Sequence, residues 1–282
     1  MKGGGFRLRL TGVTLAAALL AACSNAPGVD NAKTNMEAFS AEQIFERGEY
    51  EMEKRDYESA ATYFSEVERL YPYSEWAQRS LIMQTFALHS AHNYDESRVA
   101  AQRYLDFYPT SDDAAYAQYL LALSYYDQID EIGRDQKLTM QALQALRQVI
   151  ERYPDSEYAK SAILKFDLAF DHLAAKEMEV GRYYLKREQY GAAINRFRIV
   201  VEEFQTTSHT PEALHRLVEA YLSLGLTDEA QTAAAILGYN FRSTTWYDDS
   251  YKLLTKRGLE PKARGNGWLA QIYRQTVKGD WL

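Results

Sequence analysis

The sequence predicts an all-α protein built from about five tandem helical hairpins. Three observations support this fold class: a turn motif that recurs after amphipathic segments, a second marker that repeats at a constant spacing, and the lack of a convincing β-strand pattern in the sequence. The chain has 282 residues, of which 46% are hydrophobic and 25% are charged. This composition allows a sizeable core and excludes wholesale disorder.

The recurring turn combines an aromatic residue, a proline and a serine. It occurs at Tyr71-Pro72-Tyr73-Ser74, Tyr108-Pro109-Thr110-Ser111 and Tyr153-Pro154-Asp155-Ser156, and in a weaker form without proline at Phe204-Gln205-Thr206-Thr207. Proline ends a preceding helix, and serine or threonine can cap the next one. Each motif therefore predicts a boundary between two helices.

The second marker precedes these turns at the same separation in two pairs of segments, 56–60 with 93–97 and 189–193 with 226–230. Tetratricopeptide repeats have a period of about 34 residues, small residues where two helices meet and often a closing proline. The residues that fit this pattern are Gly48, Ala60, Phe64 and Pro72 in the first copy and Gly181, Ala193 and Phe197 in the fourth. The small residues would let the two helices of a hairpin approach closely.

We therefore predict a tetratricopeptide-repeat superhelix over residues 39–254, because one hairpin cannot cover its own apolar face and has to stack on its neighbours. The third copy contains extra residues, which we expect to form a polar loop at 130–135. Residues 158–176 supply an additional helix length before the fourth copy, and we expect an inserted helix there.

Residues 1–22 have the pattern of a secretory signal, in which a basic stretch precedes an apolar run at 10–22. That run is too short to cross a bilayer, which takes about 20 apolar residues. It ends at Leu20-Ala21-Ala22-Cys23, which resembles a bacterial lipobox. The resemblance implies cleavage before Cys23, an S-diacylglycerol on its sulfur and an N-acyl chain such as palmitate on its new amino group. A free cysteine after an ordinary signal is the alternative.

The residues after the lipobox indicate a tethered protein at the outer membrane. Residues 23–38 have little apolar content and read as a flexible tether. Lipoproteins without aspartate after the cysteine generally pass to the outer membrane, and Ser24 stands at that position. The formal net charge of −7 argues against nucleic acid as a partner.

The sequence holds no pattern typical of an active site. His89 and His92 have the spacing of one helix face, but their neighbours Ser90, Ala91 and Asn93 offer no further metal ligand of the usual kind. The single thiol, Cys23, is expected to be acylated. We therefore expect no catalytic residue, no metal and no cofactor other than the covalent lipid.

The 22 tyrosines are more than an average chain of this length carries, and most of them should be packing residues. Tyr71, Tyr73 and Trp76 gather beside Pro72, and Tyr108 holds the equivalent place one repeat later. Concave repeat surfaces bind extended peptides, often through tyrosine or tryptophan anchors. These four aromatic residues are therefore candidates either for a peptide groove or for the core.

Taken together, the lipobox, the tether and the repeats resemble the BamD family of outer-membrane lipoproteins. Local motifs add to the resemblance: Tyr-Leu-Leu-Ala-Leu-Ser-Tyr-Tyr at 119–126, Arg134-Asp135-Gln136, and the segments 176–184 and 193–197. The resemblance implies a non-enzymatic scaffold of the β-barrel assembly complex. Its N-terminal repeats would bind the β-signal of unfolded outer-membrane proteins, and its C-terminal repeats would dock on a BamA-type barrel protein, beside other lipoproteins of the complex.

The resemblance also assigns residues. Asn195 and Arg196 match the region that faces the BamA-type subunit, and Tyr71 matches a position near the substrate groove. Another tetratricopeptide lipoprotein of the envelope, such as a secretin pilotin or a cell-division coordinator, is the alternative function. The basic and aromatic tail at 255–282 either packs back on the last repeat or contacts a partner or lipid headgroups.

Overall fold

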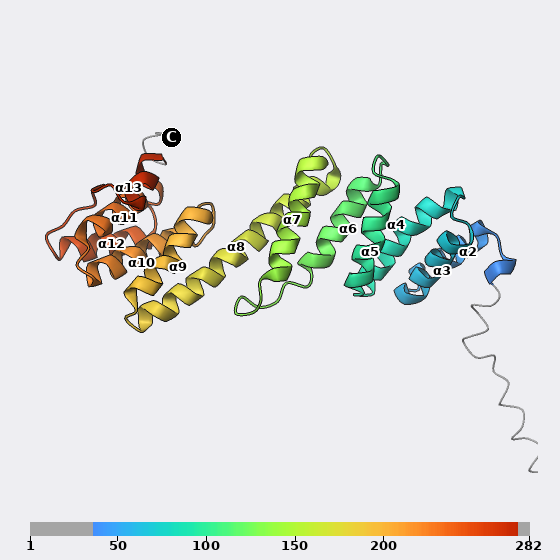
Figure 1. The fold of residues 1–282 in the computed structure, drawn as a ribbon, viewed down its shortest axis with the longest axis horizontal. Coiled ribbons are helices and arrows are strands. Elements are labelled where there is room, and N and C mark those ends of the chain that lie inside the picture. The colour runs from blue at the N-terminus through green and yellow to red at the C-terminus, as the bar shows by residue number, and fades with distance from the viewer. Residues whose placement is uncertain (1–35, 276–282) are drawn as a thin grey trace, which may run out of the picture. The chain divides into compact units, whose positions relative to one another are not determined.

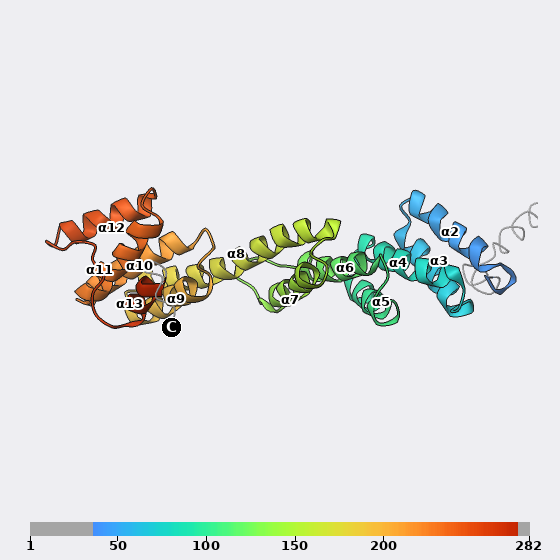
Figure 2. The ribbon, with the colours of Figure 1, turned by 90° about the horizontal axis from the view of Figure 1, so that it is seen from above.

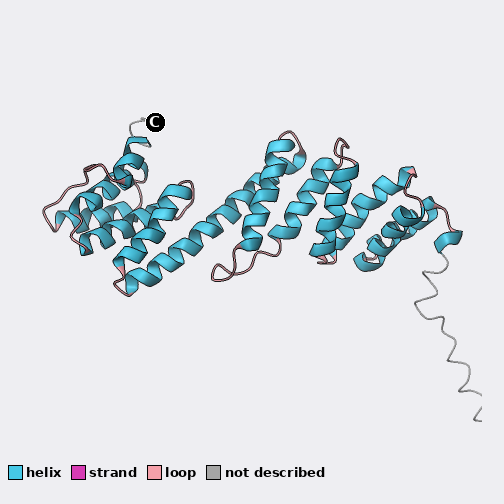
Figure 3. Cartoon of the chain, viewed as in Figure 1, coloured by secondary structure: helices cyan, strands magenta, loops and turns pink. Residues whose placement is uncertain are grey.

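The computed structural model describes residues 36–275, and all the regular structure in that range is helical (Figure 1, Figure 3). The predicted lipobox with Cys23 and most of the predicted tether lie outside the described residues. The helices in chain order are η1 (Met36–Ala38), α2 (Ala41–Glu53), α3 (Tyr57–Leu70), α4 (Glu75–Ser90), α5 (Tyr94–Phe107), α6 (Ala114–Tyr126), α7 (Lys137–Arg152), α8 (Glu157–Lys186), α9 (Tyr190–Glu203), α10 (Thr210–Ser223), α11 (Thr227–Asn240), α12 (Thr245–Thr255) and α13 (Trp268–Tyr273).

The chain forms two compact units, and the boundary between Ser80 and Leu81 falls within α4. The N-terminal unit contains the hairpin of α2 and α3. The hairpins of the C-terminal unit pair α6 with α7, α8 with α9 and α10 with α11, and α5 packs on the second half of α4 through Leu81, Ala100 and Tyr104. This arrangement confirms the predicted all-α fold of five tetratricopeptide-type hairpins.

The first hairpin shows how the sequence brings two helices close together. A capping box starts α2, in which Ser40 Oγ accepts a hydrogen bond from the Gln43 backbone and Gln43 Oε1 accepts one from the Ser40 backbone. A Cβ atom on Gly48 would lie 2.6 Å from Phe64 Cε1, so a glycine is needed where the helices meet. Gly181 repeats this contact in the fourth hairpin.

Each hairpin ends in an aromatic residue that caps its second helix with nearly the same backbone geometry. These residues are Tyr71, Tyr108, Tyr153, Phe204 and Phe241, with φ between −120° and −135° and ψ between 35° and 53°. The backbone N–H of each cap donates to the carbonyl four residues earlier. The fifth turn keeps this geometry without a proline, so the aromatic residue rather than proline is the common element.

In four of the five turns, the serine or threonine does not cap the following helix as predicted; the exception is Ser111, whose hydroxyl accepts a bond from the Asp113 backbone. Ser156 is the N-cap residue of α8, but its hydroxyl donates to the Tyr153 carbonyl at 2.8 Å and makes no capping bond. Ser74, Thr207 and Thr244 make the same bond to the carbonyl of their own aromatic cap. In these four turns the hydroxyl therefore bonds within its own turn and not to the next helix.

The inserted helix predicted at 158–176 is present, and it continues without a break into the fourth hairpin. α8 is a single helix of 30 residues, seen running from α7 to α9 in Figure 2. Its first half packs on α7 through Ala162, and its second half packs on α9 through Ala174 and Met178. Proline and glycine are absent between 157 and 180, so nothing in this stretch interrupts the helix.

The polar loop predicted in the third hairpin occupies the connection between α6 and α7. Two side chains of α8 hold it: Lys176 Nζ donates to the Gly133 carbonyl at 2.7 Å, and His172 Nδ1 lies 3.2 Å from Gln136 Oε1. The loop is therefore fixed against the helix that follows its own hairpin.

The described part of the tail packs back on the fifth hairpin. Leu269 and Ile272 of α13 are buried in the same core as α10 and α11. Thr232 Oγ1 of α11 accepts a bond from the Arg264 backbone at 2.9 Å, and Gln231 Nε2 donates to the Glu260 carbonyl at 2.7 Å. Up to Gln275, the tail therefore packs back on the last repeat, which was the first of the two expectations for it.

Candidate partner-binding sites

The aromatic candidates of the N-terminal unit differ in their surroundings. Tyr71 donates its hydroxyl to the Phe39 carbonyl at 2.6 Å, and the Trp76 ring packs on Phe45 with centroids 4.9 Å apart. Tyr73, between them in sequence, is 100% exposed. Tyr71 and Trp76 therefore stabilise the unit, and Tyr73 presents its whole side chain to solvent.

Tyr108 in the C-terminal unit occupies the same turn position as Tyr71. Its ring lies 5.3 Å from that of the fully buried Tyr104, so it covers the core of the second hairpin. The adjacent Phe107 is 64% exposed and makes an edge contact with the Tyr108 ring. The exposed aromatic residue at this turn thus precedes the cap, whereas at the first turn it follows the cap.

Many of the remaining tyrosines are packing residues, as predicted. Tyr116 and Tyr119 of α6 both stack on Tyr158 of α8, with ring centroids 5.1 and 5.4 Å away. Burial raises the pKa of Tyr116 to about 12, and the neighbouring Tyr158 adds to that shift. These rings join the third hairpin to the helix that follows it.

Asn195 and Arg196 are consecutive residues of α9. Asn195 is exposed. Arg196 Nη1 lies 3.0 Å from Glu177 Oε2 of α8, and the arginine side chain is still 41% exposed. Glu177 orients the guanidinium, and the exposed part is available to an acidic group outside the chain.

A polar cleft of about 480 Å³ lies between α8, the start of α9 and α10. Its lining carries basic side chains from Arg182, Lys186 and Arg216 and acidic ones from Glu188 and Glu219, together with Leu185, Tyr190 and Ser223. Sequence reasoning missed this cleft. The available signal was the spacing of Glu212, Arg216 and Glu219 on one helix, which puts their side chains within reach of each other.

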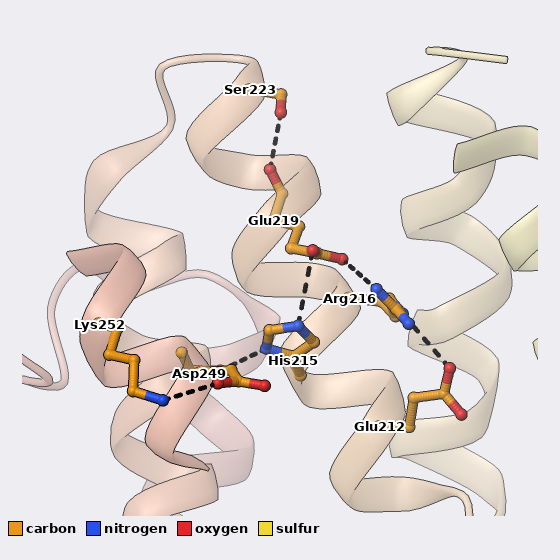
Figure 4. A network of polar contacts seen from close by, with 8 residues as sticks. Glu212, His215, Arg216, Glu219, Ser223, Asp249 and Lys252 are labelled. Carbon is orange, nitrogen blue, oxygen red and sulfur yellow. Dashed lines mark hydrogen bonds and ion pairs between the residues drawn. The ribbon is translucent and has the colours of Figure 1, made fainter. Parts of the chain in front are cut away.

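Ion pairs connect the wall of this cleft to the core of the fifth hairpin (Figure 4). Arg216 binds Glu219 at 2.8 Å and Glu212 at 3.3 Å, and Glu212 binds Arg182 of α8 at 2.9 Å. The buried His215 lies 3.5 Å from Glu219 and 2.9 Å from the Ser250 hydroxyl of α12. The network thus links three helices.

The charges of this network shift the protonation equilibria of its members. Burial by itself raises the pKa of Glu219, but hydrogen bonds from His215 and Arg216 outweigh it, so the pKa lies below the ordinary value. For Arg216, burial acts to lower the pKa, and the bonds to Glu219 and Glu212 raise it above its usual value. Both side chains are therefore held in their charged forms.

The described residues contain no group of three His, Cys, Asp or Glu side chains that could hold a metal ion. His89 Nε2 lies 3.1 Å from Asp127 Oδ2, and His92 Nδ1 lies 2.8 Å from the Tyr94 hydroxyl, so each histidine has a protein partner of its own. Within residues 36–275, none of the helices has the length and apolar content needed to span a membrane.

Comparisons with known proteins agree with one another. The family model described as YfiO, outer membrane lipoprotein, matches residues 37–236. A protein of Caulobacter vibrioides named outer membrane protein assembly factor BamD is 48% identical over 252 residues, which cover 88% of this chain and 82% of that protein. Its namesake in Rickettsia prowazekii is 40% identical over 211 residues, covering 75% of this chain and 84% of that protein.

Among solved structures, the type IV pilus biogenesis factor PilW is 15% identical and covers 74% of this chain and 97% of its own. Its TM-score of 0.24 is too low to support an argument about fold or function. The family model, by contrast, spans most of the described repeats, and the identity to the Caulobacter vibrioides protein extends over nearly the whole chain. The chain therefore belongs to the BamD family.

Proposed function

We propose that this chain is a non-enzymatic, lipid-anchored scaffold that assists the assembly of β-barrel proteins into the outer membrane. The observation that carries the proposal is the 48% identity, over 88% of the chain, to a protein named outer membrane protein assembly factor BamD. The work of such a scaffold is recognition and release of polypeptide segments, for which stacked helical hairpins offer a large surface.

Depletion of the chain in its own organism tests this proposal. Outer-membrane β-barrel proteins should fall in abundance and periplasmic chaperones should rise, because unfolded barrel proteins accumulate when assembly slows. Other outer-membrane lipoproteins, which need no barrel assembly, are the matched control. Unchanged barrel levels would contradict the proposed function.

The anchor is proposed to be the lipid on Cys23, which would hold the chain at the outer membrane on its periplasmic side. The lipobox at Leu20–Cys23 supports this proposal. Cys23→Ser should abolish labelling by radioactive palmitate and release the chain from the membrane fraction, whereas Ser24→Ala should change neither. Labelling that persists in Cys23→Ser would contradict the assignment.

Substrate β-signals are proposed to bind the N-terminal repeats near the first turn. The fully exposed Tyr73 supports this proposal, because an exposed tyrosine provides a large contact area at low conformational cost. A photo-crosslinker at Tyr73 should capture a β-signal peptide, and one at Tyr50, a half-exposed tyrosine of α2, should capture little. Equal capture at both positions would show nonspecific contact.

The C-terminal repeats are proposed to dock on a BamA-type barrel protein, beside other lipoproteins of the complex, through the surface around Asn195 and Arg196. Arg196→Glu should remove co-purification of the barrel protein, because it places a negative charge where the partner's acidic group would bind. Glu177→Gln breaks the same internal ion pair but keeps the arginine, so it should preserve association. Loss of association in both variants would indicate that the ion pair matters only for folding.

A further inference from the structure

A cleft in the C-terminal unit is lined mainly by glutamine side chains, and the proposed function gives it no role. It has a volume of about 200 Å³ and is formed by α5, α6 and α7, of which α6 packs against both of the others. None of the described residues in its lining carries a charged side chain. The lining residues are Gln102 of α5, Leu121 and Tyr125 of α6, and Gln141, Gln144, Ala145 and Gln148 of α7.

Helix α7 supplies most of the amide groups because the spacing of its glutamines follows the helical turn. Gln141, Gln144 and Gln148 are three and four residues apart, so they lie on one face of the helix. Their side-chain amides form no hydrogen bond with another residue in the described range 36–275. This wall of the cleft therefore offers hydrogen-bond donors and acceptors to a group outside the chain.

The other two helices complete the cleft with a fourth amide and an apolar surface. Gln102 Nε2 donates to Asp106 Oδ1 at 2.8 Å, which leaves the carbonyl oxygen of Gln102 as an acceptor. Leu121 and Tyr125 are one turn apart on α6 and half-buried. The cleft thus combines amide groups with an aliphatic and an aromatic side chain.

These properties argue against most classes of ligand. A charged ligand would find no counter-charge in the lining, and Arg98, which lies 4.5 Å from the centre of the Tyr125 ring, is already paired with Asp95. A purely apolar ligand would cover the glutamine amides without giving them a partner, which is unfavourable. The volume is also smaller than that of most small-molecule sites, roughly 300–1,000 Å³.

The backbone of an extended polypeptide has the chemistry that the cleft lacks a partner for. Each residue of such a chain carries an uncharged donor and an uncharged acceptor, and a glutamine amide can bind either. Backbone groups on the same side of an extended chain repeat about every 7 Å. Gln144 and Gln148 are one helical turn apart, roughly 6 Å. Neighbouring glutamines can therefore bind successive backbone groups of one chain.

We propose that this cleft binds an extended segment of unfolded polypeptide through its backbone, largely independently of sequence. Gln144 and Gln148 bind the segment from α7, Gln102 binds it from α5, and its apolar side chains contact Leu121 and Tyr125. The inference rests on the proposed function only for the source of the segment, an unfolded barrel protein. It adds to the β-signal site of the N-terminal unit a contact that any other part of the same client can make.

Fluorescence anisotropy with the full-length, lipidated protein in detergent tests the proposal, and empty micelles serve as the blank. The probes are two short, uncharged peptides with a neutral dye, one alternating serine with valine and the other threonine with alanine. Both should bind, because the contacts are to the backbone. Gln144→Leu and Gln148→Leu should each weaken binding by about 2- to 10-fold, since each removes a hydrogen bond. Gln189→Leu, which changes an exposed glutamine before α9 that makes no capping bond, should leave binding unchanged.

Methylation of the peptide's backbone nitrogens makes the test specific for the backbone. It removes N–H donors and keeps the side chains, so binding to the parent protein should weaken, and the further loss caused by Gln144→Leu should become smaller. A photo-crosslinker at Gln148 should capture the unmethylated peptide, and one at Gln189 should capture little. Undiminished binding of the methylated peptide, or equal effects at Gln189 and at the cleft, would overturn the proposal.

An oligosaccharide of N-acetylglucosamine tests the competing class of ligand, because amide and tyrosine side chains also suit sugars. If it binds at the cleft and the peptides do not, the cleft is a glycan site and the proposal is wrong. Failure of this inference is distinguishable from failure of the proposed function. Loss of barrel proteins on depletion without peptide binding contradicts the cleft assignment alone, whereas peptide binding with unchanged barrel levels supports the cleft and contradicts the assembly role.

Discussion

At the scale of single residues, two glycines face a phenylalanine ring of the same hairpin so closely that no side chain would fit. A Cβ on Gly48 would lie 2.6 Å from the Phe64 ring, and one on Gly181 would lie 2.4 Å from the Phe197 ring. Both aromatic rings are fully buried and cannot move away without disturbing the core. The two hairpins thus use the same glycine–phenylalanine contact to set the distance between their helices.

We expect Gly48→Ala and Gly181→Ala each to lower the free energy of unfolding by about 1–3 kcal/mol, because the added methyl group overpacks the contact. Urea denaturation followed by circular dichroism measures the change. Gly191→Ala is the control, since a Cβ there meets nothing within 4 Å. It should be neutral or stabilise by up to about 1 kcal/mol through helix propensity. A similar loss in all three variants would contradict the role given to the phenylalanine contact.

A pH dependence follows from Glu219. Its pKa is lowered in the folded state, so its ionised form stabilises the fold. This contribution is complete above the ordinary glutamate pKa of about 4.3 and is lost as the pH falls through the lower folded value. When the pH is lowered from about 5 to about 3, the urea concentration at the unfolding midpoint should therefore decrease. The decrease should be smaller in Glu219→Gln than in the parent.

Glu203→Gln removes the same charge at an exposed position of α9 and serves as the control for this titration. Glu219→Gln should also be less stable than the parent at neutral pH, because it weakens the bond to Arg216 and the contact with His215. An unchanged acid dependence in Glu219→Gln would show that another group dominates in this range.

Which aromatic residues face solvent could not be predicted from the sequence. Tyr71, Tyr73 and Trp76 are all aromatic and lie close together along the chain. Their surroundings differ because Phe39, which follows η1, approaches Tyr71 and Phe45 of α2 approaches Trp76. The glycine–phenylalanine contacts, by contrast, were predictable. Their spacing repeats in two copies, and a small residue that recurs at a fixed distance from a large one indicates a close approach of two helices.

At the scale of elements, the loop between α6 and α7 depends on α8. Lys176 is the long side chain that reaches across to the Gly133 carbonyl. Lys176→Ala should raise the rate of tryptic cleavage after Arg134 by about 2- to 10-fold, since an exposed hydrogen bond contributes about 0.5–1.5 kcal/mol. Lys160→Ala, an exposed change on the same helix, should leave the rate unchanged. Equal cleavage in both variants would mean that the loop keeps its conformation without the hydrogen bond from Lys176.

The positions of helices followed from the sequence, but two element boundaries did not. The turns at Tyr71, Tyr108 and Tyr153 were predictable because proline marks them, and the turn at Phe241 carries no such mark. The continuity of α8 was missed because the repeat pattern requires two helices in this stretch. Proline and glycine are the strongest signals for the end of a helix, and the sequence has neither between 157 and 180.

The polar cleft beside α10 could not be predicted from the sequence either. It depends on Arg182 and Arg216, which come from two helices separated by the whole of α9. Charge spacing within α10 indicates pairs on that helix but not which other helix faces them. Such a site becomes visible only after the hairpins have been packed.

At the scale of the whole molecule, the packing is local along the chain. Within the C-terminal unit, helices pack mainly against those next to them in sequence. In proteins with this kind of contact, stability is close to a sum over repeats and their interfaces. A defect in one hairpin should therefore remain near that hairpin.

We expect Phe64→Ala, which costs about 3–5 kcal/mol at a buried site, to speed hydrogen exchange in α2 and α3 and to leave α10 and α11 protected. Phe197→Ala is the matched variant and should affect α9 and the second half of α8 while leaving α2 and α3 unchanged. Uniform acceleration along the chain in either variant would show that the molecule unfolds as one cooperative unit.

The length of the continuous helix α8 sets the rotation between the two hairpins that pack on it. Its 30 residues span roughly 45 Å, and each residue rotates the direction of its side chains by about 100°. The third hairpin packs near one end and the fourth near the other, so the number of residues between them fixes their relative phase. Deleting seven residues from the middle would shift that phase by about 20°, whereas deleting two would turn it by about 160°. Insertions and deletions in this helix are therefore tolerable only in near-whole numbers of turns.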